Sequence, residues 1–347
     1  MRLIKYTVIF FAAAALFSCS LFLGQDPENN PKAIFDSIWN DFDKTYALFE
    51  VKHIDWKAVY NSHIADIYSG MSDKELFTVC CEMLGELDDS HALLNSPFDS
   101  YNSGGRFSAS NMEIFSLELI KNDYLTDYKT AGNGMFTYGK FKPELSVNSI
   151  GYIYISGFAN GENTGGSQDW IKAIDGIISS LGGTDSLVLD VRGNRGGLSA
   201  NVDYIASRFA SQTKDYAQVR TRDGPGRSDF SAPVNFTIKP DGTRYTKPIA
   251  FITNAQTISA GEWFTLALLS QDHVTHFGST TCGAFSLSLS RFLINGWNYT
   301  VSVQKVTDMD GICYEDTGIS PAVITANTAE NIDDQLEEAL SFLTIHP

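Results

Sequence analysis

The hydrophobic pattern divides the chain into a helical first part and a second part in which strands and helices alternate. Apolar residues recur at intervals of three and four through residues 34–49, 56–67 and 76–87, which is the spacing of one buried helix face. Ser72 and Glu75 form a capping-box sequence ahead of the third segment. Three short helices make too small a core to be stable alone, so we expect them to pack against the rest of the chain.

From residue 150 onward, segments with strand-like and helix-like patterns alternate. Strands are expected at residues 150–158, 186–191, 217–222, 236–239, 248–253, 274–277, 287–293 and 299–305, with one or two more within 107–120. Helices are expected at residues 170–181, 201–209, 259–269 and 332–343. Asn295-Gly296 is a strong hairpin turn between the last two strands. This alternation predicts an α/β core whose sheet is covered by helices.

One of the strand–turn–helix junctions carries candidate chemistry. The apolar run 248–253 predicts a buried strand, and the helical pattern begins at Ser259. A serine at the start of a helix lies beside free N–H groups, which stabilise negative charge on a nucleophile and its oxyanion. The alternative is that Ser259 and Glu262 only form a capping box, with Glu262 as a cap or helix-face residue.

The N-terminus has the features of an export signal. Residues 1–18 begin with positive charges and continue into an apolar segment that is too short to span a bilayer. Leu16-Phe-Ser-Cys19 resembles a bacterial lipobox, which implies lipidation of Cys19 and a polar tether over residues 19–31. An ordinary cleaved signal peptide or an uncleaved anchor are the alternatives. We expect a lipid-anchored protein of the bacterial cell envelope, on the periplasmic or cell-surface side of a membrane.

Composition narrows the possible partners. The formal net charge of −16 argues against nucleic acid and against a polybasic membrane-binding surface. No Cys-x-x-Cys or His-rich spacing suggests a metal site, and no cofactor is expected. In an exported protein Cys282 could pair with Cys313, while the adjacent Cys80 and Cys81 are expected to pack in a helix.

Three motifs occur in a fixed order along the second part of the chain. They are Asp190-Val-Arg-Gly-Asn-Arg-Gly-Gly197, Thr257-Ile-Ser259-Ala-Gly-Glu262 and Gly278-Ser-Thr-Thr281-Cys-Gly283. Together they resemble the serine peptidases of the C-terminal processing (tail-specific) and tricorn-core family over about residues 30–325. The resemblance implies a crotonase-like catalytic domain with an N-terminal helical domain.

The resemblance also implies an oxyanion hole. It assigns the backbone donors to the turn at Gly196 and Gly197 and to Ala260, the residue after the nucleophile. Glycines after a buried strand also allow the backbone to approach a ligand closely, because they carry no Cβ atom. Asp190 and Arg192 are expected to be structural, with Arg192 holding the loop in place.

The general base distinguishes two branches of this family. The C-terminal processing branch uses a lysine, and the matching position here is Ala284, so a Ser–Lys dyad is not expected. The tricorn-like branch uses a Ser–His pair and a distant glutamate, which match Ser90, His91 and Glu315. Under this resemblance Ser259 attacks the carbonyl and His91 takes its proton. Ser90 then orients His91, and Glu315 orients Ser90.

We therefore expect an exported, lipid-anchored serine peptidase acting on proteins or peptides. The expected organisation is a signal peptide (1–18), a lipidated tether (19–31), a helical domain (32–98) and a crotonase-like peptidase domain (99–347). Two alternatives remain open. One is a catalytically inactive cell-surface protein that binds peptide or glycan, and the other is an esterase that uses the same serine. The sequence gives no oligomeric state.

Overall fold

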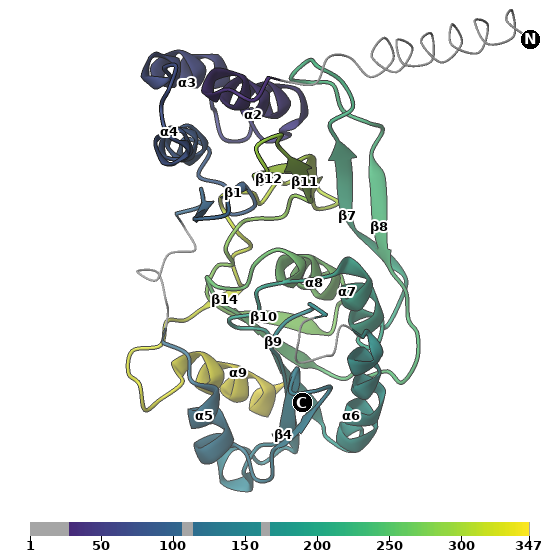
Figure 1. Cartoon of the computed structure of the whole chain (residues 1–347). Helices are drawn as coiled ribbons and strands as arrows, with labels where there is room; N and C mark the ends of the chain where they lie inside the picture. The colour runs from purple at the N-terminus through teal and green to yellow at the C-terminus, as the bar shows by residue number, and fades with distance from the viewer. Residues whose placement is uncertain (1–27, 106–113, 161–166, 347) are drawn as a thin grey trace, which may run out of the picture.

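The computed structural model describes residues 28–105, 114–160 and 167–346. The signal peptide and the Cys19 lipidation site that we expect lie outside these residues. Helices α2, α3 and α4 lie at one end of the molecule, and the large sheet with its covering helices lies at the other (Figure 1). Within the described ranges, no helix is both long enough and apolar enough to cross a membrane.

The three N-terminal helices form where the pattern places them. They are α2 (Pro31–Thr45), α3 (Trp56–His63) and α4 (Asp73–Gly85). The capping box before α4 is complete, because the Ser72 N–H donates to Glu75 Oε2 (2.7 Å) and the Glu75 N–H donates to Ser72 Oγ (3.3 Å).

The hydrophobic core under these helices is completed from a distant part of the chain. Trp297, Tyr299 and Val301 are buried in the same cluster as the apolar faces of α2 and α4. The expectation that the small helical region packs against later residues is confirmed. The helices of residues 32–98 therefore share one core with the C-terminal third of the chain.

A seven-stranded sheet forms the centre of the larger part of the molecule. Its strands, in spatial order, are β14 (Val323–Ile324), β10 (Val274–Gly278), β9 (Ile249–Thr253), β6 (Ser186–Asp190), β5 (Ile150–Ile155), β4 (Phe136–Lys140) and β3 (Lys129–Ala131). The strands from β14 to β5 are parallel, β4 is antiparallel to β5, and β3 is antiparallel to β4.

Both faces of the sheet are buried at its central strands, which explains why β6 and β9 are largely apolar. Leu187 and Leu189 of β6 pack into the hydrophobic cluster on one face, and Val188 packs into the cluster on the other. The first face is covered by α6 (Ala173–Leu181), α7 (Ser199–Ala206) and α8 (Ala260–Leu269), and the second by α9 (Asp334–Ile345) and the short α5 (Leu117–Leu119) (Figure 1). The predicted α/β fold with N-terminal helices is confirmed.

Two smaller sheets connect this core to the N-terminal helices. One contains β11 (Ser288–Phe292), β12 (Asn298–Ser302), β1 (Leu93–Asn95) and β2 (Ser100–Asn102), in that order, and includes the hairpin expected at Asn295-Gly296. The other contains β13 (Gln304–Thr307), β7 (Lys214–Thr221) and β8 (Val234–Ile238). In Figure 1, β7 and β8 run along one side of the molecule between the helices and the core.

Two expectations differ from the structure, and one open question is answered. Residues 117–124 are helical rather than extended, as α5 and a following π-helical turn, while residues 106–113 lie outside the described part. The single strand expected at 299–305 is two strands in different sheets, because the chain passes from β12 to β13 at Val303. The sequence left open whether Cys282 pairs with Cys313, and the structure shows no disulfide between these two described residues.

Candidate active site

Three neighbouring parallel strands bring the three sequence motifs to one edge of the central sheet. β6 leads into the glycine-rich loop, β9 leads into the turn at Ser259, and β10 leads into the loop that begins at Gly278. Their spatial order is β10, β9, β6, so their carboxyl ends lie side by side. Binding sites in such sheets form at the carboxyl ends of the strands.

Ser259 has an unusual backbone conformation at the start of α8. Its φ is 59° and its ψ is −122°, a positive φ that is rare for a residue with a Cβ atom. The turn links strand β9 to helix α8, which is the strand-to-helix arrangement of a nucleophile elbow. Strain of this kind persists where the surroundings hold it, and it is concentrated at functional sites.

The glycine-rich loop is fastened to the Ser259 turn by Asn194. The Asn194 carbonyl accepts a hydrogen bond from the Ile258 N–H (3.1 Å), next to the candidate nucleophile. The buried Asn194 side chain accepts from the Gly196 N–H (2.9 Å) and donates to the Ile155 carbonyl (3.1 Å). One asparagine therefore fixes the loop against both strand β5 and the start of α8.

Gly196 lies so close to the Ser259 turn that no side chain fits there. A Cβ atom on Gly196 would lie 2.8 Å from the Ala260 nitrogen and 2.9 Å from Ser259 Cβ, and its φ is 81°. Gly197 has a φ of 142° and packs even more closely, because a Cβ atom there would lie 2.1 Å from the Phe158 carbonyl carbon. The Gly196 N–H already donates to Asn194. Gly196 therefore lets the loop approach the Ser259 turn closely, but it does not offer its N–H to a ligand.

Glu262 does more than cap α8. Its carboxylate accepts from the Ser259 N–H (3.1 Å), the Thr281 hydroxyl (2.7 Å), and the N–H groups of Gly283 (2.6 Å) and Ala284 (2.8 Å). Burial raises the pKa of Glu262 to about 7, against the opposing effect of these donors. The sequence predicted the cap, but the long-range bonds to the loop after β10 could not be read from it.

Glu315 is the second buried carboxyl group at this loop. It accepts a hydrogen bond from the Phe285 N–H (3.0 Å), one residue beyond the Ala284 N–H that Glu262 binds. Burial raises the pKa of Glu315 well above its usual range, and the nearby charges of Asp89 and Glu262 act in the same direction. Glu315 is thus close both to the turn that carries His91 and to the helix that begins at Ser259.

His91 lies in the turn between α4 and β1. Its carbonyl accepts from the Thr300 hydroxyl (2.6 Å), which anchors the turn to β12, and its N–H donates to Asp89 Oδ1 (2.7 Å). Its Nδ1 is buried and has no hydrogen-bond partner among the described residues. Burial lowers the pKa of His91 below its usual value, against the opposing charge of Asp89, which favours the neutral imidazole.

Ser90 and its neighbours complete the described part of the site. The Ser90 carbonyl accepts from the Asn102 side chain (3.2 Å), and Gly104 lies against the Ser90 hydroxyl and backbone, leaving no room for a Cβ atom. Between residues 28 and 346, the described side chains of Ser259, His91, Ser90 and Glu315 are not joined to one another by hydrogen bonds. The buried Asp89, which lies close to Glu315, was not singled out from the sequence.

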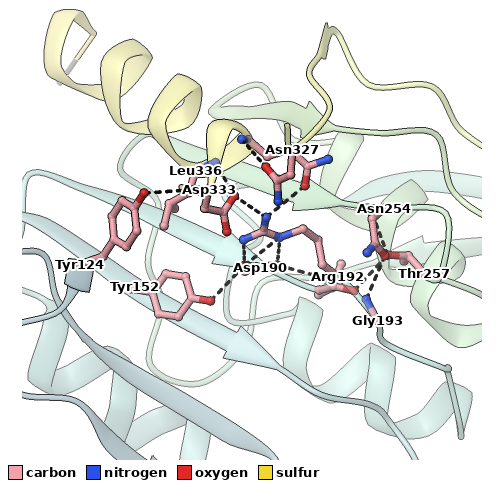
Figure 2. A network of polar contacts seen from close by, with 12 residues as sticks. Tyr124, Tyr152, Asp190, Arg192, Gly193, Asn254, Thr257, Asn327, Asp333 and Leu336 are labelled. Carbon is pink, nitrogen blue, oxygen red and sulfur yellow. Dashed lines mark hydrogen bonds and ion pairs between the residues drawn. The ribbon is translucent and has the colours of Figure 1, made fainter. Parts of the chain in front are cut away.

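Arg192 is structural, as expected from the sequence. Its buried guanidinium binds Asp190 through Nη2 (2.7 Å) and Asp333 through Nη1 (2.7 Å), and Tyr152 donates to Asp190 Oδ2 (3.0 Å) (Figure 2). Asp333 is the N-cap residue of α9. The start of the glycine-rich loop is therefore tied to the C-terminal helix rather than to a ligand.

Ala284 occupies the position where the lysine-using branch would carry its base. It is 3% exposed, and it packs with Ile258 and Cys282 directly beside the Ser259 turn. No cluster of three or more His, Cys, Asp or Glu side chains suited to a metal ion occurs in the described ranges.

Comparison with known proteins identifies the family to which this chain belongs. Residues 149–325, just over half of the chain, match peptidase family S41, and residues 27–85 match the tricorn protease C1 domain. The chain therefore belongs to peptidase family S41.

Individual relatives are similar to this chain over most of its length. Carboxy-terminal processing protease CtpB of Bacillus subtilis is 28% identical over 249 residues, which are 72% of this chain and 48% of CtpB. The chain thus spans about half the length of that relative. A solved structure of a proposed peptidase from Parabacteroides merdae is 29% identical, with a TM-score of 0.79, over 91% of this chain and 97% of that one. Mature CPAF in complex with lactacystin shares the fold at 12% identity, with a TM-score of 0.68, over 90% of this chain and 96% of that one.

Proposed function

We propose that this protein is a serine peptidase whose nucleophile is Ser259. The observation that carries the proposal is the strained backbone of Ser259 at the first turn of α8, with Gly196 packed directly against it. A strained turn exposes a serine at the end of a strand, and the helix N-terminus stabilises the charge that develops there. Membership of peptidase family S41 supports the same reaction.

Acylation follows the usual course for an activated serine. Ser259 Oγ attacks the carbonyl carbon of the scissile peptide bond while its proton passes to His91. The tetrahedral intermediate collapses when His91 returns that proton to the leaving nitrogen, and the C–N bond breaks. Water then attacks the acyl-enzyme, with His91 again as the base, and releases the second product.

The electrostatics of His91 support its role as base. Burial keeps its imidazole neutral, so it is ready to accept a proton near neutral pH. Its buried Nδ1 has no partner among the described residues, and we assign this nitrogen to the Ser90 hydroxyl. In this proposal Ser90 fixes the tautomer of His91, and Glu315 supplies negative charge behind the pair.

Two backbone N–H groups are suited to bind the oxyanion. Those of Ala260 and Gly197 make no hydrogen bond to any other residue in the described ranges. The Ala260 N–H lies at the N-terminus of α8, where the helix dipole adds to its effect. The Gly196 N–H was a third candidate from the sequence, but its bond to Asn194 removes it from this role.

The proposed substrates are proteins or peptides, and the proposed location is the bacterial cell envelope. The name of CtpB, a carboxy-terminal processing protease, supports a polypeptide substrate. The lipobox-like sequence ending at Cys19 supports a lipid anchor, although it lies outside the described residues. The absence of a lysine at Ala284 supports the Ser–His–Glu arrangement over a Ser–Lys dyad.

Peptide hydrolysis distinguishes this proposal from an esterase and from an inactive binding protein. Wild type and the variants Ser259→Ala and Ser270→Ala are incubated with an unfolded protein, and new chain ends are identified by mass spectrometry. Ser270 caps the opposite end of α8 and serves as the matched control. We expect cleavage by wild type and Ser270→Ala but not by Ser259→Ala. Hydrolysis of acyl esters alone would favour the esterase, and no hydrolysis would favour the binding protein.

A further inference from the structure

Lys52 is an almost fully buried lysine at the junction between the N-terminal helices and the catalytic core. It lies in the turn between α2 and α3, and only 3% of its side chain is exposed. Lysine is rarely buried to this extent unless its charge is paired. The contacts that compensate this burial therefore indicate what Lys52 does.

The Lys52 ammonium binds two segments that are far apart in sequence. It donates to the Asp88 carbonyl (3.1 Å) and forms an ion pair with Asp316 Oδ1. Asp88 is three residues before His91, and Asp316 directly follows Glu315. One side chain of the N-terminal region thus joins the turn that carries the proposed base to the loop that carries the proposed glutamate.

Both partners of Lys52 have strained backbones. The φ of Asp88 is 44° and that of Asp316 is 63°, and few non-glycine residues of the described chain have positive φ values. Such conformations are energetically unfavourable and persist only where surrounding contacts hold them. The Asp316 N–H also donates to the Gly283 carbonyl (2.8 Å), and the Gly283 N–H donates to Glu262. Glu262 accepts in turn from the Ser259 N–H, so hydrogen bonds connect Asp316 to the Ser259 turn.

We propose that Lys52 is a positioning residue for the reaction, which clamps the His91 turn and the Glu315 loop together across the junction between the helices and the core. The proposal rests on the proposed function, because it assigns Lys52 a role in aligning His91 and Glu315. Lys52 acts through these two residues rather than on the substrate.

The charge of Lys52 adds an electrostatic effect to this mechanical one. Glu315 is buried, and its pKa is raised by burial and by Asp89, whereas the Lys52 charge opposes that rise. The titratable groups that face Glu315 are Asp89, Glu262, Lys52, Tyr46 and Cys313. Lys52 is the cation in this set, so its removal makes Glu315 harder to ionise.

The test measures how fast a fluorophosphonate probe labels the protein as a function of pH. We expect Lys52→Met to be labelled at least about tenfold more slowly, because small misalignments of catalytic groups have large effects on rate. We also expect the rise of labelling with pH to move to higher pH, since Glu315 then ionises later. Lys52→Arg keeps the charge and should keep the wild-type midpoint. Lys32→Met removes an exposed lysine–aspartate pair, with 62% of the lysine side chain exposed, and should behave as wild type.

Asp316→Asn provides a second variant in case Lys52→Met fails to fold. It weakens the clamp at a side chain that is 29% exposed, and it should also slow labelling. The double variant Asp316→Asn/Lys52→Met should slow labelling by less than the product of the two separate fold-changes, because both substitutions break the same clamp. If wild type is labelled and Asp316→Asn and folded Lys52→Met match it in rate and midpoint, the clamp is refuted while the proposed function stands. If wild type itself is not labelled, the proposed function fails, and the clamp fails with it.

Discussion

Ser259 combines the proposed nucleophile with a backbone conformation that glycine tolerates better than serine. Its positive φ is imposed by the turn from β9 into α8 and held by the Ser259 N–H bond to Glu262. The conformation is thus a local cost that the rest of the fold offsets. A residue that tolerates a positive φ should therefore give a more stable protein at position 259 than a residue that does not.

Replacement of Ser259 tests this strain directly. Ser259→Ala and Ser259→Gly both remove the hydroxyl, but only glycine adopts a φ near 60° without a steric cost. We expect Ser259→Gly to exceed Ser259→Ala in free energy of unfolding by about 1 kcal/mol, measured by chemical denaturation. An alanine variant that is the more stable of the two would contradict the claim of strain.

His91 offers a second test at the level of one residue. Burial lowers its pKa below the usual 6.5, so the folded protein binds its proton less readily than the unfolded chain does. We expect an NMR titration of the His91 ring, assigned by comparison with His91→Gln, to give a midpoint below 6.5. The contribution of His91 to stability is therefore full above pH 6.5 and decreases as the pH falls below it. A midpoint above 6.5 would contradict the burial argument.

At the scale of elements, the ends of β6 and β9 were predictable because each strand is a short, mostly apolar run that stops at a polar or glycine-rich loop. The end of β10 was predictable from the Gly278 loop that follows it. The alternating pattern predicts the order of these strands along the chain. It does not predict that they are neighbours in the sheet, which is what brings their loops together. Periodicity could not predict that Glu262 binds the loop after β10, because those donors are backbone groups with no sequence signature. The clamp at Lys52 was not foreseen because its partners, Asp88 and Asp316, lie far from Lys52 in the sequence.

The glycine-rich loop gives a prediction with a built-in control. Gly196 and Gly193 both have positive φ, at 81° and 72°, but a Cβ atom at Gly196 meets the Ala260 nitrogen at 2.8 Å, whereas at Gly193 the nearest atom is 3.8 Å away. We expect Gly193→Ala to cost about 1 kcal/mol of stability and Gly196→Ala clearly more, with loss of probe labelling. Equal effects of the two substitutions on labelling would contradict the assigned packing of Gly196 on the nucleophile turn.

At the scale of the whole molecule, the proposed site draws on the first, middle and last parts of the chain. His91 comes from the N-terminal helical region, Ser259 from the core and Glu315 from the loop after β13. The shared hydrophobic cluster under α2 and α4 and the ion pair at Lys52 connect these parts. Sequence reasoning places each part in an element, but tertiary contacts decide how they meet.

Arg192 holds the C-terminal helix to the same assembly. Arg192→Met would leave Asp190 and Asp333 buried without their cation (Figure 2). We expect it to lower the free energy of unfolding by about 3–5 kcal/mol, the cost of breaking a buried ion pair from one side. Thermal and chemical unfolding measure this change. A loss below about 1 kcal/mol would show that the network contributes little to folding.

The central claim is that Ser259 is a nucleophile activated by His91. The most direct measurement is covalent labelling by a fluorophosphonate probe, with the modified residue located by mass spectrometry in wild type, Ser259→Ala and His91→Ala. We predict that wild type is labelled on Ser259, that Ser259→Ala is not labelled, and that His91→Ala is labelled much more slowly. Correctly folded wild type that is not labelled, or labelling of Ser259 at an unchanged rate in His91→Ala, would contradict this account.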